Sequence, residues 1–317
     1  MKIVLDIDKL LADGQISDDD YDRFKQLSLK ETGSLAFNIL IGFGVIATAG
    51  GALALLPSSL TAIALGFLLA GAGLLLTLNL ANEWGLLGSI LLLVGAVTAA
   101  GGMVALFEGG AFGFFIVAVL CLVAAILSKS VMLTILSTLS LSAMVGAFTA
   151  YGHATYFLAI RQPTVTVVLF TILALAAYHL SKRLTPDYER IAIAFSRTSL
   201  FLVNLGFWVG SLWGDSLWQQ RDHWDFRNGA LIPDIVFVIG WAIAIIATGI
   251  WAAGANRRWV VNLLVVFGAI HFYTQYFELF GGNPGSILMA GLVAIAIAVA
   301  IVWYNKSARS ANVVIEE

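Results

Sequence analysis

Long apolar runs separated by short polar segments form the dominant pattern of the chain between Gly33 and Tyr304. Most runs are long enough to cross a hydrocarbon core of ~30 Å as a helix that rises ~1.5 Å per residue. The five prolines all lie between runs, where a missing N–H group disturbs a helix least. The pattern predicts an all-α, polytopic membrane bundle of about ten transmembrane helices. Their approximate ranges are 33–56, 60–81, 84–106, 110–128, 130–151, 163–180, 190–213, 234–254, 258–280 and 285–304.

Lysine and arginine positions predict the side of the membrane on which each connection lies. With the N-terminus inside, the inner connections carry Lys129, Lys182, Arg183, Arg190, Arg257 and Arg258, and the outer ones carry Arg161, Arg221 and Arg227. Because cytoplasmic loops hold the excess of basic residues, both termini are expected in the cytoplasm. The chain then divides into a cytoplasmic helical hairpin at 1–32, the transmembrane bundle at 33–304 and a cytoplasmic tail at 305–317.

The N-terminal hairpin has clear helix boundaries. Gly14 suits the position just after a short first helix. Ser17 is expected to cap the second helix, with Asp20 as its third residue. Two short helices cannot bury enough surface to be stable alone. Residues 1–32 are therefore expected to rest on the membrane domain, on a second copy of the chain or on a partner protein.

Glycines repeat in two similar segments, "TAGGALALLPSSL" from Thr48 and "AAGGMVALFEGGA" from Ala99. At this offset Gly44 aligns with Gly95, and each would lie on a smooth helix face that lets a neighbouring backbone approach closely. The alignment predicts tandem helical-hairpin repeats. A third copy near the C-terminus would place Gly268 on Gly95 and Gln275 on Gly102.

The stretch "HFYTQYFELF", which runs from His271 to Phe280, interrupts the apolar pattern. Spacings of four and seven residues place His271, Gln275 and Glu278 on one helix face. By the helical rise, His271 lies about 18 Å and Asn204 about 20 Å into parallel spans, close to the midplane. Asn204, His271 and Gln275 are therefore the candidate polar site. These three residues could form a hydrogen bond between helices, or they could form a binding site, and both interpretations remain open.

Two further charges lie within the predicted spans. Arg197, near the cytoplasmic end, is expected to extend toward the headgroups or to form a structural pair, with substrate binding as the alternative. Glu278, near the outer end, is expected to pair with Arg221 or Arg227. The longest outer loop contains Asp222, His223 and Asp225. We interpret these residues either as part of a segment that lies at the membrane interface or as metal ligands.

Composition supports the membrane class and narrows the chemistry. The chain is 60% hydrophobic with a mean hydropathy of +0.93, against roughly 45–50% apolar in soluble domains. A single cysteine, Cys121, allows no disulfide within one chain, and no basic face for nucleic acid is visible. The metalloprotease, nucleophile-elbow, P-loop and dinucleotide-binding motifs are all missing from the sequence. We therefore expect a non-enzymatic protein without a cofactor or metal, with the lipid bilayer as its main partner.

The "DGQISDDDYDRF" hairpin, the closely spaced apolar runs and the motif "HFYTQYFELF" resemble a bacterial family of multi-spanning inner-membrane proteins of unknown function. The hairpin is also similar to short oligomerisation modules, through Gly14, Ile16, Ser17, Asp20 and Tyr21. The resemblance implies a bacterial plasma membrane and supplies no activity, substrate or catalytic residue.

Two functions of different class remain open. The favoured one is a membrane scaffold or regulator that works through the N-terminal hairpin. The alternative is a small-solute or proton-coupled transporter that uses the Asn204, His271 and Gln275 level. Inverted repeats with broken helices, the usual indication of a secondary transporter, are not visible in the sequence.

Overall fold

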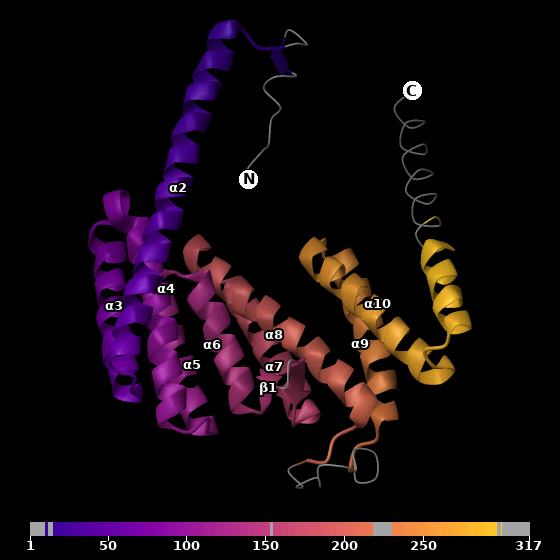
Figure 1. Cartoon of the computed structure of the whole chain (residues 1–317). Coiled ribbons are helices and arrows are strands. Elements are labelled where there is room, and N and C mark those ends of the chain that lie inside the picture. The colour runs from indigo at the N-terminus through magenta and orange to yellow at the C-terminus, as the bar shows by residue number, and fades with distance from the viewer. Residues whose placement is uncertain (1–9, 12–14, 153–154, 218–229, 297–298, 300–317) are drawn as a thin grey trace. The chain divides into compact units, whose positions relative to one another are not determined.

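The computed structural model describes residues 10–11, 15–152, 155–217, 230–296 and 299, which are almost entirely helical (Figure 1). The chain divides into two compact units. The first contains Met1–Met144 and His179–Phe195, and the second contains Val145–Tyr178 and Ser196–Glu317.

The first unit begins with α2 (Asp18–Leu55), which Figure 1 shows as one unbroken helix. Its 38 residues extend about 57 Å at the helical rise. The predicted cap is confirmed, because the Ser17 side chain accepts a hydrogen bond from the Asp20 backbone N–H at 3.2 Å. The second helix of the predicted hairpin and the first predicted span are therefore one continuous helix, of which Leu40–Leu55 is the apolar part.

The remaining helices of this unit are α3 (Ser59–Asn79), α4 (Ala81–Leu106), α5 (Ala111–Ser128) and α6 (Val131–Met144). The single residue Leu80 separates α3 from α4, and these two helices make the most extensive contact in the described structure. Gly88, Gly95 and Gly102 lie seven residues apart on α4 and face α3. A Cβ atom added at Gly95 would lie 2.7 Å from the Gly66 carbonyl oxygen. The predicted close packing of Gly95 is confirmed.

The equivalent prediction for Gly44 is wrong. In the described part of the chain, no heavy atom outside its own helix lies within 4 Å of a Cβ atom built at Gly44, and the same holds for Gly50, Gly51 and Gly101. The glycines that complete the close contact are Gly66 and Gly73 of α3. The reason is that the glycine face of α4 packs against α3. The matching glycines therefore lie on α3 and not on α2.

The second unit starts with a short antiparallel hairpin of β1 (Ala147–Gly152) and β2 (Thr155–Ile160), in which Ala147 pairs with Ile160. The prediction of a helix over 130–151 is therefore wrong beyond Met144. Gly146 has a φ of +86°, a conformation that ends a helix. Its carbonyl oxygen accepts a hydrogen bond from the Arg161 N–H at 3.1 Å, which closes the base of the hairpin.

Four long helices and one shorter helix complete the second unit. They are α7 (Pro163–Ser181), α8 (Pro186–Trp213), α9 (Asp234–Gly254), α10 (Arg258–Phe280) and a helix at Pro284–Ala296; the first turns of α8 belong to the first unit. Phe170 and Trp241 are completely buried in this unit. All five prolines lie at or beside helix starts, as predicted.

Seven of the described helices are long and apolar enough to cross a membrane. They are α3, α4 from Trp84, α5, α7, α8, α9 and α10. Leu40–Leu55, Val131–Met144 and Pro284–Ala296 are apolar but shorter, and they occupy the places of the first, fifth and tenth predicted spans. The chain is thus a helical membrane protein.

Candidate functional site

The asparagine of the candidate site is fixed by two hydrogen bonds. Asn204 lies on α8 and is 3% exposed. Its Nδ2 donates to the Leu200 carbonyl oxygen at 2.9 Å, and its Oδ1 accepts from the Trp241 indole Nε1 at 2.9 Å. Because Trp241 belongs to α9, this bond ties α8 to α9 inside the second unit. Asn204 therefore acts as a structural residue with both polar atoms used.

Trp241 also contacts the histidine of the candidate site. The centroids of the Trp241 and His271 rings are 4.8 Å apart, with an angle of 69° between the rings. The edge-to-face arrangement is favourable for aromatic pairs. The structure thus brings Asn204 and His271 to one level, as their depths predict, and places the Trp241 ring in contact with both. No local signal in the sequence distinguishes Trp241 from the other tryptophans of the chain.

Two polar atoms at this level have no partner. His271 Nδ1 and Gln275 Nε2 are buried and make no hydrogen bond to any described residue. The two residues are one helical turn apart on α10, so they share a face. An unsatisfied buried donor or acceptor costs about 1–3 kcal/mol, so these two atoms call for an explanation.

The other polar groups of "HFYTQYFELF" are occupied. Thr274 Oγ1 accepts a hydrogen bond from the Trp208 indole Nε1 of α8 at 3.0 Å. The hydroxyl of Tyr276 donates to the Ser286 carbonyl oxygen at 3.1 Å, and that of Tyr273 to the Ala290 carbonyl oxygen at 3.4 Å. His271 and Gln275 therefore differ from their neighbours on the same helix.

The secondary charges lie away from this level. Arg197 is exposed, and its guanidinium lies 4.9 Å from the centroid of the Trp259 ring, a cation–π contact that supports the predicted structural role. Glu278 is exposed near the end of α10. Its expected partners Arg221 and Arg227, and the alternative metal ligands of the same loop, lie outside the described residues. Within the described ranges, no group of three or more His, Cys, Asp or Glu residues could hold a metal ion.

Sequence reasoning missed one buried carboxylate. Asp215 follows α8 and is 1% exposed. Its Oδ2 accepts a hydrogen bond from the Thr164 backbone N–H at the start of α7 at 2.8 Å, and its Oδ1 accepts from the Leu217 N–H at 2.9 Å. The carboxylate thus caps α7 within the second unit, a role that depends on a residue 51 positions away.

The apolar helices and their buried polar contacts define an integral membrane protein of the helical-bundle class. No protein-family model matches the chain, and no curated protein or solved structure matches it. The function must therefore be inferred from the site itself.

Proposed function

We propose that the chain is a transport-type integral membrane protein in which His271 and Gln275 bind a proton or a small polar solute near the middle of the bilayer. One observation carries the proposal, namely the two buried, unpartnered polar atoms that these side chains place on one face of α10. An imidazole nitrogen can take up a proton, and an amide N–H can donate to a carbonyl or hydroxyl oxygen of a solute.

The contrast with Asn204 supports a binding role. If the whole polar level only joined helices, each side chain would reach a partner, as Asn204 does through Trp241. Polar groups inside a membrane are costly and commonly mark a substrate or proton path. In the proposed topology the chain crosses the membrane ten times, because the three shorter apolar helices are inserted as well. Both termini then lie in the cytoplasm of a bacterium. The lysine and arginine distribution and the family resemblance support this topology.

The test is a pH titration of the histidine side chains by NMR, with the full-length protein in lipid nanodiscs. The chain has only four histidines, so His153→Gln, His179→Gln and His223→Gln identify the His271 signal by elimination. A proton site reached by water gives an imidazole signal that changes over the range of about pH 5 to 8. A His271 signal that stays constant while the other three change would contradict the proposal.

Transport is tested separately from binding. In proteoliposomes with a potassium gradient and valinomycin, an internal pH dye reports proton movement. We expect His271→Ala to abolish the movement and His179→Ala, which removes an exposed imidazole at the end of α7, to preserve it. Equal rates for wild type and His271→Ala would show that α10 carries no proton path.

A second candidate function, a membrane scaffold or regulator, is favoured by the length of α2. At about 57 Å this helix exceeds the ~30 Å hydrocarbon core, so its polar part extends beyond the membrane. Phe24 on that part is 41% exposed, and Tyr21 lies one turn before it on the same face. An apolar face on a helix that extends beyond the membrane suits a partner helix or a second copy of the chain.

The scaffold function predicts that Tyr21→Ser with Phe24→Ser abolishes self-association or partner binding by the full-length protein. Chemical crosslinking in native membranes would measure the loss, with Asp19→Ser and Asp22→Ser as the control pair on the same helix. Unchanged crosslinking in the Tyr21 and Phe24 variant would remove the scaffold candidate and leave the His271 proposal untouched.

A further inference from the structure

A polar pocket of about 350 Å³ lies at one end of the first unit, around the connection between α5 and α6. Its lining brings together two cations and four hydroxyl groups, namely Lys129, Arg190, Thr77, Ser89, Ser128 and Ser130. These residues come from four helices and one connection, so the fold gathers them from distant parts of the sequence. The pocket lies outside the His271 site and is not used by the proposed function.

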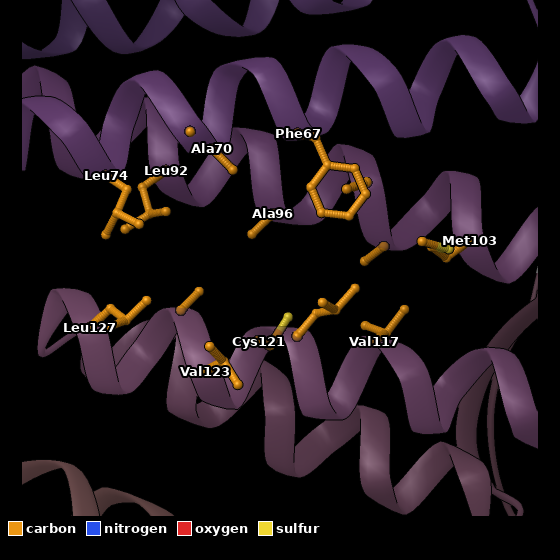
Figure 2. Close-up of a pocket in the computed structure, with 15 residues that line it drawn as sticks. Phe67, Ala70, Leu74, Leu92, Ala96, Met103, Val117, Cys121, Val123 and Leu127 are labelled. Carbon is orange, nitrogen blue, oxygen red and sulfur yellow. The ribbon is translucent and has the colours of Figure 1, made fainter.

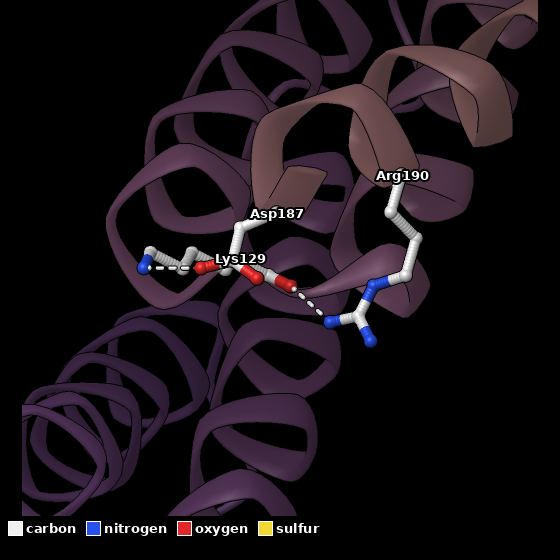
Figure 3. Close-up of polar contacts among 3 residues, drawn as sticks. All are labelled: Lys129, Asp187 and Arg190. Atoms are coloured by element: carbon white, nitrogen blue, oxygen red, sulfur yellow. Dashed lines mark hydrogen bonds and ion pairs between the residues drawn. The ribbon is translucent and has the colours of Figure 1, made fainter. Parts of the chain in front are cut away.

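The two cations are held in place by their neighbours (Figure 3). Lys129 adopts a left-handed conformation after α5, and its Nζ lies 2.6 Å from Asp187 Oδ2. Arg190 Nη2 donates to the Lys129 carbonyl oxygen at 3.4 Å. An arginine has five N–H groups, and among the described residues Arg190 uses only one of them in a hydrogen bond. With one carboxylate against two cations, the group keeps a net positive charge that suits an anion.

An apolar cavity of about 260 Å³ lies next to this pocket, and Leu92 lines both. It lies between α3, α4 and α5, and its wall consists of aliphatic, aromatic and sulfur-containing side chains and glycine. Figure 2 shows Leu74 and Ala96 on one side of the gap and Leu127 and Cys121 on the other. Such an apolar groove has no polar group that could bind a soluble anion, but it can hold a hydrocarbon chain.

The length of the groove matches one leaflet of a bilayer. Its lining runs from Leu92 to Met103 on α4 and from Val117 to Leu127 on α5. These stretches of twelve and eleven residues correspond to about 15–17 Å at the helical rise, roughly half of the ~30 Å hydrocarbon core. Leu127 is followed directly by Ser128 and Lys129, so the groove reaches the polar pocket at its end.

We propose that the first unit binds one anionic glycerophospholipid, with its phosphate on Lys129 and Arg190 and one acyl chain in the groove of α3, α4 and α5. Basic pockets between transmembrane helices recognise anionic headgroups in this way. Three of the four hydroxyls, those of Thr77, Ser89 and Ser128, donate to carbonyl oxygens of their own helices, which leaves their oxygens as acceptors for a headgroup hydroxyl. Phosphatidylglycerol has both the phosphate and the hydroxyls that this pocket suits.

Native mass spectrometry of the full-length protein tests the proposal. The protein is equilibrated with equal amounts of phosphatidylglycerol and phosphatidylcholine that carry identical acyl chains, and retained lipid is counted. We expect wild type to retain one phosphatidylglycerol. Lys129→Gln and Arg190→Gln should each weaken its binding about fivefold, from ~1 kcal/mol per basic residue. Arg183→Gln removes an exposed cation outside the pocket lining and should leave binding unchanged.

A groove variant separates the acyl chain from the headgroup. Ala96→Phe fills the groove without changing charge and should reduce lipid retention as strongly as the cation variants. Val97→Phe is the control, because Val97 lies next to it on α4, is 52% exposed and does not line the groove. Circular dichroism and thermal unfolding confirm that each variant is folded, and Arg190→Lys, which keeps the charge, should retain the lipid.

Several results would overturn the proposal, and one of them needs no variant. Equal retention of the two lipids by wild type would show that the cations do not select the headgroup. Retention that survives Ala96→Phe but is lost on addition of inorganic phosphate would show a site for free anions and not for a lipid. Retention that survives the loss of both cations would place the lipid elsewhere on the protein.

Discussion

The α3–α4 pair of the first unit and the α9–α10 pair of the second unit are both consecutive helices with short connections, and they are held together differently. In α3–α4, Gly95 meets the backbone of Gly66 and Ala70 directly. In α9–α10, a Cβ atom added at Gly268 would approach only the Cγ2 methyl group of Ile245, at 3.8 Å. There, the Trp241 ring of α9 contacts the rings of Phe267 and His271 of α10.

The difference shows two solutions to one problem. Lipid is as apolar as the helix surfaces, so helices associate in it through close packing or through hydrogen bonds. Where two backbones pack closely, as at Gly95, no room remains for a polar side chain between the helices. Packing through side chains is looser and places polar atoms between helices, some of which remain unpaired, as at His271. The candidate site therefore lies at the helix pair that packs through side chains, α9–α10.

The largest expected effect breaks the close packing. Gly95→Leu forces a side chain into the backbone of α3, and we expect a loss of about 3 kcal/mol or more, seen as failed expression or a lower thermal midpoint. Gly44→Leu is the matched control, because its position is open in the described structure. If Gly95→Leu folds at wild-type levels, α3 and α4 are not in close contact.

A smaller effect measures the hydrogen-bonded packing of the second unit. Trp241→Phe removes the indole N–H from Asn204 and should cost about 1–2 kcal/mol. A double-mutant cycle with Asn204→Leu should give a coupling of roughly 0.6–1.7 kcal/mol. Trp251→Phe, at a tryptophan that is 46% exposed, serves as the control. A coupling near zero would mean that the bond contributes nothing to the packing of α8 on α9.

The smallest expected effect lies at the exposed ends of the helices, where water weakens charge pairs. The hydrogen bond to Asp187, and then its negative charge, raise the pKa of Lys129 above its ordinary value. Because the pKa is higher in the folded than in the unfolded state, the charged lysine stabilises the folded protein. This stabilisation is complete below the unfolded pKa of about 10.4, and it is lost as the pH rises through the folded pKa. The thermal midpoints of wild type and Lys129→Gln should therefore differ slightly at neutral pH and converge at strongly alkaline pH. Lys182→Gln is the control, and a difference that grows with pH would contradict the assignment.

Local signals predicted much of the fold. The Ser17 cap, the prolines between helices and the apolar periodicity depend on residues close together in the chain, and the structure agrees with them. The end of α6 at Met144 was missed because the apolar run continues to Tyr151, while Gly146 adopts a conformation that no periodicity reveals.

Partners across the fold were harder to predict. The sequence identified Gly95 as a packing position but assigned the same role to Gly44, because a repeat in sequence does not state which helix lies opposite. The depth of Asn204 and His271 was predictable from the helical rise. The ring between them was not, because Trp241 contacts Asn204 from 37 residues away.

The single-residue connection at Leu80 also affects how the protein is made. Contacts that are close in sequence form quickly, since little loop entropy is lost. The α3–α4 hairpin can assemble as soon as Leu106 has left the ribosome, whereas His271 follows roughly 10–30 s later at normal rates of synthesis. The glycine-packed hairpin would then be a finished scaffold in the membrane while α8, α9 and α10 are still being translated, and a defect at Gly95 would act during biosynthesis, before any polar site exists.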